Sequence, residues 1–566
     1  MPYTSPVDDF RFILDHVVGF DAVAATERYA EATPDMVSAI LTEAGKMCDS
    51  VLAPLNRAGD LTPAKLENGV VRTSPGYAEG YRAIADGGWV GMAADPEHGG
   101  MGLPMTVTTA VNEMMGGACL ALQLNPLMTQ AEIEALEHHA SPELQALYLP
   151  KLVSGEWCGT MNLTEPQAGS DVGALRTKAE PKGDGTYAIS GQKIYITWGD
   201  NDFSDNVVHM VLARLPDGAP GTKGISLFLV PKYIPDADGK PGEANSLRVV
   251  SLEHKMGIHG SPTAVMEYDG ATGWLVGEPH AGMAAMFTMM NNARLGVGGQ
   301  AIGVAEAATQ AALAYAMDRK QGKAGGSGAI VEHADVRGML ARMRAETFAA
   351  RAIALACARA MDMGRADDSS AARARAAFLT PIAKAYGTET GISVADLGIQ
   401  VHGGMGFIEE TGAAQFLRDV RITAIYEGTN GIQAMDLVGR KLMDGGEAAF
   451  ALLDEIEAGA EAARGSLPDL AEPVWQAAEA LREATDWLLA RDPAERFAGA
   501  LAYLRAFARV LGGHMHLRAA MAGDGKRKRL AAFYIARMLP EHAAHLAALR
   551  AGAGSVMALG AEDLGV

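Results

Sequence analysis

The spacing of apolar residues changes character twice along this chain, and these changes limit the folds it can adopt. Residues 36–155 carry apolar side chains at helical spacing. Residues 156–280 instead hold short β-type runs, such as 207–212 and 224–230, between turns rich in glycine and proline. Helical spacing then returns and continues to the end of the chain. The pattern predicts an α+β protein in which a β-barrel or sandwich lies between helical domains.

The length of the chain also requires several domains, because 566 residues exceed what one hydrophobic core accommodates. We predict five parts in chain order. They are an N-terminal arm (1–35), an N-terminal helical domain (36–155), a middle β-domain (156–280), a C-terminal helical domain (281–445) and a helical extension (446–566).

Two of these parts carry apolar residues that need a partner surface. In the arm, Phe10, Phe12, Ile13 and Leu14 are suited to packing on a neighbouring subunit. In the extension an apolar stripe runs along one helix face, and we expect it to cover the outer face of the C-terminal helical domain. The stripe consists of Leu501, Leu504, Phe507, Val510 and Leu511.

Charge and cysteine content exclude several classes of function. The net charge of −20 argues against general affinity for nucleic acid or an anionic membrane. The four cysteines stand singly, which favours buried thiols in a reducing compartment over disulfides or a metal site. The first residues show neither a basic region nor an apolar run, and no segment has membrane-spanning length. We therefore expect a cytoplasmic protein without a bound metal.

One short run, residues 425–433, places a single carboxylate between an aromatic residue and a glycine. It reads Ile-Tyr-Glu-Gly-Thr-Asn-Gly-Ile-Gln, and the acid is Glu427. Apolar neighbours such as Ile432 favour loss of hydration, and burial raises the pKa of a carboxylic acid toward the range of a general base. Gly428 lets a ligand approach the backbone closely. Taken alone, the run fits equally well an ordinary helix N-terminus with an acid near its cap.

Three further runs hold polar and glycine-rich loops that are suited to a cofactor. Residues 163–173 (LTEPQAGSDVG) gather hydroxyls, glycines and backbone N–H groups, which hydrogen-bond ring edges or phosphates. Residues 191–199 (GQKIYITWG) alternate like a strand, and residues 400–407 (QVHGGMGF) form a glycine-rich loop. Because no G-x-G-x-x-G follows an early strand, a Rossmann-bound cofactor is not expected. A cofactor would have to lie between domains.

In this order and spacing the runs resemble the acyl-CoA dehydrogenase family of flavoenzymes over roughly residues 35–445. Residues 96–103 (PEHGGMGL) are similar to the family's N-terminal turn, and residues 254–261 (HKMGIHGS) to the segment that closes its β-domain. The resemblance implies the acyl-CoA dehydrogenase fold. It also implies that Glu427 removes the α-proton of an acyl-CoA thioester while the β-hydride passes to flavin N5. The backbone N–H of Glu427 and a flavin hydroxyl would polarise the thioester carbonyl.

The resemblance also implies the residues that contact FAD. Met161 and Tyr195 stand where many members carry an aromatic residue or tryptophan. Arg319, Gln400 and Gly404 would reach the ADP half of an FAD held by another subunit, which implies at least a homodimer. The full set is Met161, Leu163, Thr164, Gly169, Ser170, Tyr195, Thr197, Arg319, Gln400, Gly404 and Thr429.

For the acyl-CoA substrate, the resemblance implies a second set of contacts. Asn291 replaces a common aspartate and, with Arg294, would face the CoA moiety. Tyr426 and Gly428 would shape the slot that holds the thioester between the base and the flavin ring. Ser170 completes the set on the side of the β-domain.

Several activities remain open within this resemblance. The first is a dehydrogenase that passes electrons to electron-transfer flavoprotein, and the second is a related oxidase that uses oxygen. A flavin-bearing, DNA-associated alkylation-response protein is a third, but it needs a basic C-terminal face, and the extension has only the short basic run 526–529, expected to start a solvated helix. The chain most resembles the 3-methylmercaptopropionyl-CoA dehydrogenase group, which acts in dimethylsulfoniopropionate breakdown. The resemblance lies in its length, its C-terminal extension and the sequences of residues 161–173 and 424–437. A straight-chain acyl-CoA is the alternative substrate.

Overall fold

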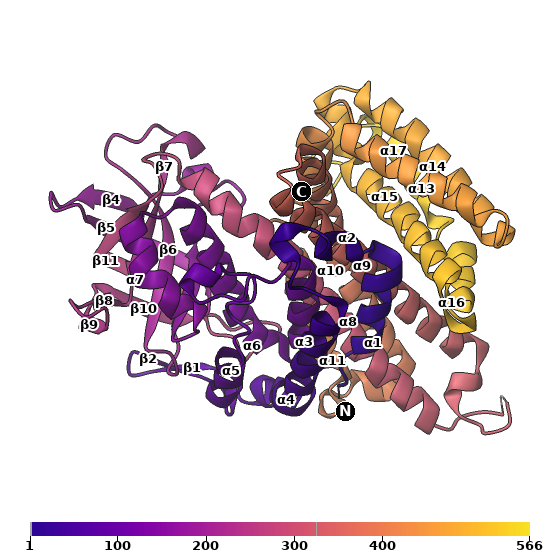
Figure 1. Cartoon of the computed structure of the whole chain (residues 1–566), viewed down its shortest axis with the longest axis horizontal. Coiled ribbons are helices and arrows are strands. Elements are labelled where there is room, and N and C mark those ends of the chain that lie inside the picture. Colours follow the sequence, from indigo (N-terminus) through magenta and orange to yellow (C-terminus); the bar gives the residue numbers. More distant parts are fainter. Residues whose placement is uncertain (1–2, 324, 566) are drawn as a thin grey trace.

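The structure is a computed structural model that describes residues 3–323 and 325–565, without the side chain of residue 291. A β-domain stands at one end and long helices form the middle of the molecule (Figure 1). A further layer of helices covers the opposite end. This arrangement is the predicted α+β architecture with an added C-terminal helical region. None of the helices in the described part of the chain is long and apolar enough to cross a membrane.

The N-terminal helical part is built around α6 (Met105–His139), whose side chains are almost all buried. Its helical geometry breaks at Cys119, where φ is −157° and ψ is 90°. Shorter elements pack around α6. They are α1 (Val7–Ile13), η1 (Leu14–Val18), α2 (Asp21–Ala24), η2 (Glu27–Tyr29), α3 (Pro34–Met47), η3 (Cys48–Leu52), α4 (Ala53–Leu61), β1 (Lys65–Glu67), β2 (Val70–Arg72), α5 (Tyr77–Asp86), η4 (Pro96–His98) and α7 (Pro142–Val153).

The middle of the chain forms the predicted β-domain. Strand β7 pairs with both β11 and β6, so that β11, β5, β4, β6 and β7 close into a ring, which confirms a barrel. Strands β3 and β10 extend the sheet on either side. The elements are β3 (Trp157–Asn162), η5 (Val172–Ala174), β4 (Lys178–Pro181), β5 (Tyr187–Thr197), β6 (Asn206–Arg214), η6 (Thr222–Gly224), β7 (Ile225–Pro231), β8 (Tyr233–Pro235), β9 (Pro241–Ala244), β10 (Leu247–Leu252) and β11 (Thr263–Val276).

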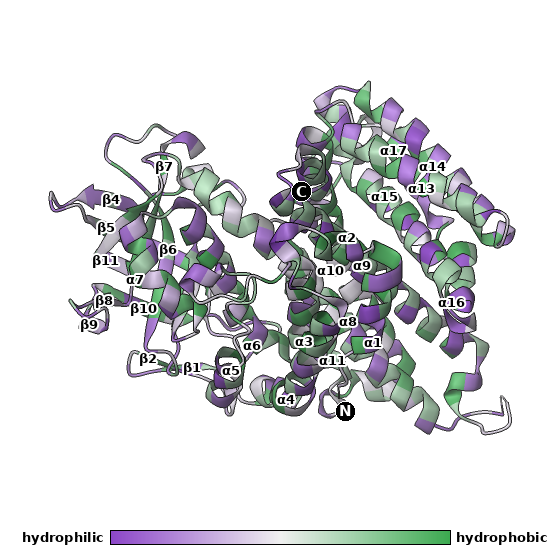
Figure 2. Cartoon of the chain, viewed as in Figure 1, coloured by the Kyte–Doolittle hydropathy of each residue, from purple (hydrophilic) through white to green (hydrophobic). Residues whose placement is uncertain are grey.

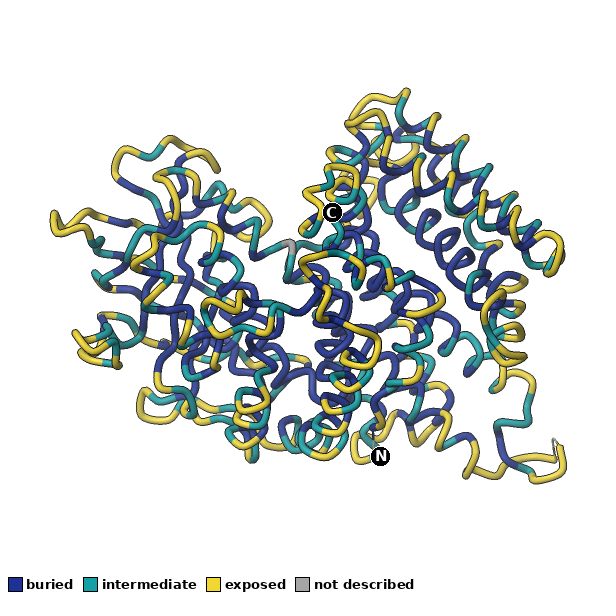
Figure 3. Tube along the Cα trace, viewed as in Figure 1, coloured by how far each residue is buried: buried dark blue, intermediate teal, exposed yellow. Residues whose placement is uncertain are grey.

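Three long helices follow the barrel and pack beside α6 to form the main core (Figure 3). They are α8 (Gly282–Asp318), α9 (Ala334–Ala366) and α10 (Ser370–His402). The segment after α10 returns across them toward the start of α8. Its elements are η8 (Gly403–Phe407), η9 (Glu409–Thr411), α11 (Ala413–Val420), η10 (Arg421–Ala424), α12 (Asn430–Asp436) and η11 (Leu437–Lys441), and η7 (Ile330–Glu332) precedes α9.

The extension packs on the outer face of α9 and α10, as the apolar stripe predicted (Figures 1 and 2). Leu504, Phe507 and Val510 are buried, and the Phe507 ring contacts that of Phe378 with centroids 5.0 Å apart. Two bidentate ion pairs also join the extension to these helices, from Arg505 to Glu389 on α10 and from Arg509 to Glu346 on α9. The extension comprises α13 (Glu447–Ala463), α14 (Pro468–Leu489), α15 (Pro493–Ala522), α16 (Gly525–Arg537), α17 (Glu541–Arg550) and α18 (Gly554–Met557).

The arm differs from expectation, because its apolar residues are buried within the same chain. Phe10, Ile13 and Leu14 are almost inaccessible, and the buried Arg351 guanidinium lies 4.8 Å above the Phe10 ring. Asp9 pairs with Arg351 on α9 and with Arg527 on α16. The basic run of the extension begins α16 with three exposed residues, as predicted, and only Arg527 contacts the arm. The five-part division by residue number stays a prediction.

Candidate active site

Glu427 lies in a short irregular segment between η10 and α12, in an uncommon backbone conformation. Its φ is 55° and that of Gly428 is 82°, so two consecutive residues are left-handed. Such a conformation costs a non-glycine residue about 1 kcal/mol or more and is typical of functional sites. None of the described residues accepts a hydrogen bond from the backbone N–H of Glu427. This donor is thus available to a ligand.

The electrostatic surroundings of Glu427 suit a general base. Loss of hydration raises the pKa of its carboxyl to about 7, and the nearby cations Arg294 and Lys384 act in the opposite direction. Lys384 Nζ donates to Gly428 O (2.9 Å) and Asn430 Oδ1 (3.1 Å). It therefore fixes the turn that carries the base. A pKa near neutrality maximises proton-transfer ability at working pH.

The substrate-side residues expected from sequence lie around this turn. Arg294 is buried on α8 with Nη1 3.6 Å from Asp436 Oδ2. The Tyr426 hydroxyl donates to Gln300 Oε1 at 2.5 Å. Thr429, predicted to contact FAD, lies in the same turn and caps α12, since its hydroxyl accepts the Ile432 N–H. The side chain of Asn291 lies outside the described residues.

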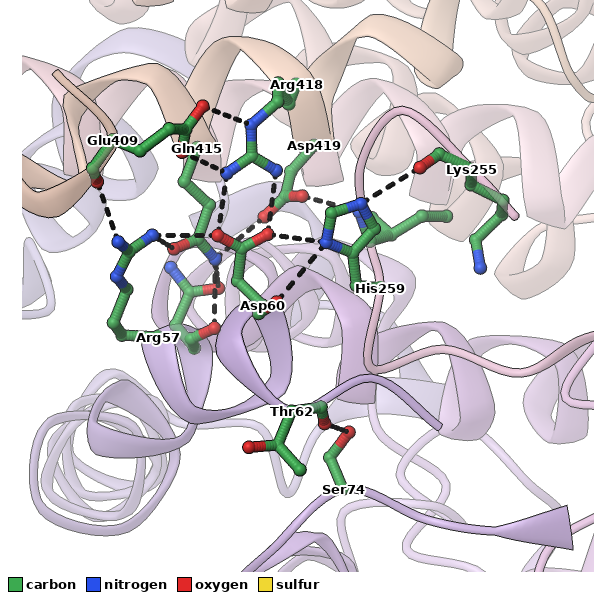
Figure 4. A network of polar contacts seen from close by, with 12 residues as sticks. Arg57, Asp60, Thr62, Ser74, Lys255, His259, Glu409, Gln415, Arg418 and Asp419 are labelled. Atoms are coloured by element: carbon green, nitrogen blue, oxygen red, sulfur yellow. Dashed lines mark hydrogen bonds and ion pairs between the residues drawn. The ribbon is translucent and has the colours of Figure 1, made fainter. Parts of the chain in front are cut away.

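A polar network joins three domains just before the base (Figure 4). Asp60 on α4 accepts two hydrogen bonds of 2.7 Å from Arg418 on α11, and one oxygen lies 2.9 Å from His259 Nδ1. The neighbouring Asp419 accepts the Ile258 N–H. A Cβ at Gly257 would lie 2.3 Å from Arg418 O, so only glycine fits at this position. The network anchors the chain that leads to Glu427.

A buried ion pair holds the loop expected to contact the cofactor. Glu165 accepts hydrogen bonds from Thr177 and from Lys193 Nζ, which also donates to Leu163 O. Pairing with Lys193 lowers the pKa of Glu165 to about 2. Burial lowers the pKa of Lys193 to about 8. Gly169 and Ser170 remain exposed beyond this anchor, so their backbone and hydroxyl groups are free to meet a ligand.

The adjoining barrel surface presents apolar and polar groups side by side. Met161 is the one residue of β3 that is not fully buried, and Leu163 and Thr164 follow it partly exposed. On β5, Tyr195 has a φ of 61° and is 61% exposed, at a register shift between β5 and β11. Such a bulge re-aims side chains. The partly exposed Thr197 ends the strand.

The remaining predicted cofactor residues lie far from this surface. Arg319 ends α8, about 38 Å beyond Arg294 at a helix rise of about 1.5 Å per residue. Gln400 and Gly404 lie at the end of α10, where the His402 ring stacks on Tyr315 of α8 at 4.4 Å. All three predicted residues are exposed. The predicted cofactor residues of one chain therefore form two separate groups.

A cavity of about 370 Å³ is lined by residues of α6, α8, α9 and α10, among them Arg294, together with Asp436 and Lys441. Its lining includes four basic side chains (Arg294, Arg365, Arg373 and Lys441) and two acids, Glu134, which pairs with Arg365, and Asp436, which pairs with Arg294. Clustered cations of this kind suit a phosphorylated ligand. No local pattern in the sequence points to Arg365, Arg373, Lys441 or Lys384, because each lies on a helix whose partners are set by tertiary packing.

Four family models match the chain in succession. They are "Acyl-CoA dehydrogenase, N-terminal domain" (residues 37–156), "Acyl-CoA dehydrogenase, middle domain" (160–271), "Acyl-CoA dehydrogenase, C-terminal domain" (280–443) and "Acetyl-CoA dehydrogenase C-terminal like" (452–560). The chain belongs to the acyl-CoA dehydrogenase family. The predicted family is thereby confirmed, and the protein is an acyl-CoA dehydrogenase of a family that depends on FAD.

Characterised relatives align over most of this dehydrogenase. It is 46% identical to 3-methylmercaptopropionyl-CoA dehydrogenase from Ruegeria pomeroyi, over 89% of this chain and 88% of the relative. It is 36% identical to a butyryl-CoA dehydrogenase from Syntrophomonas wolfei, over 78% and 75%. Caenorhabditis elegans ACDH-11 in complex with C11-CoA has the same fold, with a TM-score of 0.79, 20% identity and coverage of 94% and 91%.

The surfaces of this acyl-CoA dehydrogenase fit FAD. The barrel side offers apolar groups (Met161, Leu163, Tyr195) for a ring, next to hydroxyl and backbone donors for its polar edge and phosphates. The guanidinium of Arg319 and the backbone of Gly404 suit the adenylate half of FAD. This donor set is what a flavin dinucleotide requires.

Activity should depend on pH through Glu427. Because the base must be ionised, kcat/KM is expected to rise with pH, with a midpoint of about 7. Lys384→Met removes a cation that lowers this pKa, so the midpoint should move up and activity at about pH 6 should fall ~fivefold, recovering in alkali. Lys384→Arg keeps the charge and should retain the midpoint. If the midpoint is the same in Lys384→Met as in the wild type, Lys384 does not lower the pKa of Glu427.

Proposed function

We propose that this dehydrogenase oxidises 3-methylmercaptopropionyl-CoA to methylthioacryloyl-CoA, with Glu427 as the base. The observation that carries the proposal is the pairing, in one residue, of a carboxyl with a pKa of about 7 and an unoccupied backbone N–H. A thioester whose carbonyl accepts that N–H presents its α-carbon to the same residue's carboxylate. The acyl group follows from the relative with 46% identity, which is named for this substrate.

The residues around Glu427 would have separate roles in the reaction. The Glu427 N–H polarises the carbonyl, and the charge that develops on its oxygen is stabilised by a donor fixed before reaction. Arg294 and Lys384 keep enough anionic Glu427 at neutral pH for proton removal. Tyr426 and Gly428 form the walls of the thioester slot. FAD, when bound at residues 161–170, 195 and 197, supplies the acceptor for the β-hydride.

The basic cavity is proposed to hold the phosphates of CoA. It opens beside Arg294 and Asp436, and Arg365, Arg373 and Lys441 add positive charge away from the base. Contacts of this kind orient the thioester without touching the reacting carbons. Asn291 and Ser170 are proposed to contact the part of CoA between the cavity and the base.

A homodimer is proposed, because one chain presents its cofactor groups on two surfaces. Arg319, Gln400 and Gly404 lie too far from the barrel loop to serve the same FAD, so they would serve that of a second copy. At this end Met405, Phe407 and Ile408 are exposed, Phe407 by 85%, as expected of a surface that a partner covers. Electron-transfer flavoprotein is the proposed electron acceptor.

Substrate profiling tests the proposed reaction. With purified, flavin-loaded protein and a series of CoA thioesters, 3-methylmercaptopropionyl-CoA should give the highest kcat/KM, by about tenfold over octanoyl-CoA and longer chains. Butyryl-CoA is the strongest competitor, since a relative with 36% identity is named for it. A maximum at medium or long straight chains would overturn the proposed substrate. Faster turnover with oxygen than with electron-transfer flavoprotein would identify an oxidase.

A further inference from the structure

One buried side chain holds the backbone of the base from the C-terminal side. Gln433 lies in α12, wholly inaccessible to solvent, and its Nε2 donates to Glu427 O (3.2 Å) and to Gly428 O (3.4 Å). Among the described residues, no other group donates to Glu427 O. A Cβ at residue 428 would lie 2.8 Å from Gln433 Nε2. Glycine at this position therefore leaves room for the amide.

The residue before the base is fixed as well. The Tyr426 N–H donates to Ile422 O (3.2 Å), and the Tyr426 hydroxyl donates to Gln300 Oε1 (2.5 Å). Glu427 thus lies between a residue held in place on one side and its own carbonyl held in place on the other. Because these two constraints fix both φ and ψ, they keep Glu427 in the left-handed region, which is unfavourable for a residue with a side chain.

The left-handed conformation sets the direction of two groups at once. Rotation about φ or ψ turns the N–H and the Cα–Cβ bond of Glu427 relative to the rest of the chain. The N–H is the proposed donor to the thioester carbonyl, and the Cβ carries the carboxylate that would remove the α-proton. Since the carbonyl and the α-carbon are neighbouring atoms of the substrate, both groups serve one thioester only while this conformation persists.

Gln433 itself contributes little to the stability of the fold. Its Oε1 is buried and accepts no hydrogen bond from the described residues, and a buried acceptor without a partner is destabilising. The two hydrogen bonds that its Nε2 donates are longer than usual. Gly428 O also keeps Lys384 as a second donor. A methionine would fill the same space without an unpaired acceptor, so stability does not require the amide.

We propose that Gln433 is the positioning residue of the base: it holds the Glu427 carbonyl and thereby directs the N–H and the carboxylate of Glu427 to one thioester. This inference rests on the proposed role of Glu427 as the base. Gln433 is inaccessible, so it contacts neither substrate nor flavin and takes no part in proton transfer. Lys384 acts differently, because its charge lowers the pKa of Glu427, whereas the neutral amide of Gln433 affects geometry alone.

Gln433→Met tests this role, because it keeps the length of the side chain and removes the donor. We expect kcat for 3-methylmercaptopropionyl-CoA to fall about 30-fold while KM changes less than about threefold. The pH midpoint should stay at about 7, since no charge is lost. Tm should fall by no more than about 2 °C.

The matched control is Gln145→Met. The Gln145 amide likewise donates to two successive carbonyls, Leu136 O and Glu137 O (3.0 Å each), but at the far end of α6. This variant should keep the wild-type kcat and the wild-type isotope effect described next.

An isotope effect separates positioning from a loss of folded enzyme. With deuterium on the α-carbon of the substrate, the isotope effect on kcat should be larger in Gln433→Met than in the wild type, because proton removal then limits turnover more fully. A merely structural role would lower Tm and the fraction of active enzyme but leave the isotope effect at its wild-type value. That result would overturn the proposal, and so would an unchanged kcat.

The outcomes also distinguish this inference from the proposed function. A wild type that is inactive with 3-methylmercaptopropionyl-CoA but active with butyryl-CoA refutes the proposed substrate, and the two enzymes are then compared with butyryl-CoA. A Glu427→Gln enzyme with normal turnover refutes the proposed base and the inference with it. If Gln433→Met does not fold, Gln433→Leu removes the same donor with a shorter side chain. Failure of both variants to fold shows that the amide stabilises the protein, and it overturns the inference.

Discussion

Glu427→Gln should lower turnover about 10³-fold or more while the protein keeps its flavin. The substitution preserves the shape of the side chain and the left-handed backbone, but a neutral amide accepts no proton. The carbonyl-polarising N–H remains, so substrate affinity should change little. The measurement is single-turnover bleaching of the flavin by substrate without oxygen, together with a binding assay for a CoA thioester.

The control for this result is Glu409→Gln, an exposed acid upstream of the base that pairs with Arg418 at 2.9 Å. It should reduce turnover less than about threefold, because an exposed ion pair contributes little. A yellow Glu427→Gln enzyme that bleaches at a rate near the wild type would show that another group removes the proton.

Truncation after residue 445 should give an aggregated or highly oligomeric protein. Removal of the extension uncovers apolar side chains of α9 and α10, among them Phe348 and Phe378, both almost fully buried in the intact chain. It also strips the buried Glu346 of its bidentate partner Arg509. Loss of one member of a buried pair typically costs about 3–5 kcal/mol. Size-exclusion chromatography and flavin content measure the outcome.

A matched truncation keeps this experiment interpretable. Termination after Gly554 removes a tail whose described residues, 555–565, are all exposed, and should leave oligomeric state and turnover unchanged. If the protein cut at residue 445 is instead a flavin-loaded dimer with normal turnover, the extension is an independent bundle. The contact of the extension with α9 and α10 would then be dispensable for solubility and for flavin binding.

The sequence by itself predicted the order of the domain types and singled out Glu427 as the candidate base. Helical and β-type spacing are local properties, because the side chains that define them lie within a few residues of each other, and the barrel and long helices follow them closely. The same holds for Glu427, whose neighbours Tyr426 and Gly428 are adjacent in the chain. Gly257 and Gly260, in the segment that closes the β-domain, were recognised from the sequence as part of a motif. The sequence did not show why these positions need glycine.

Only the tertiary structure decided what surrounds the base. Lys384 and Arg294 come from helices whose sequences read as ordinary core, and their effect on Glu427 depends on packing between α8, α10 and α12. The arm was expected on a neighbour and lies on its own chain, where Asp9 pairs with Arg351 and with Arg527 near the other end of the sequence. A pattern of spacing records which face of a helix is buried, but it does not record which residue lies opposite.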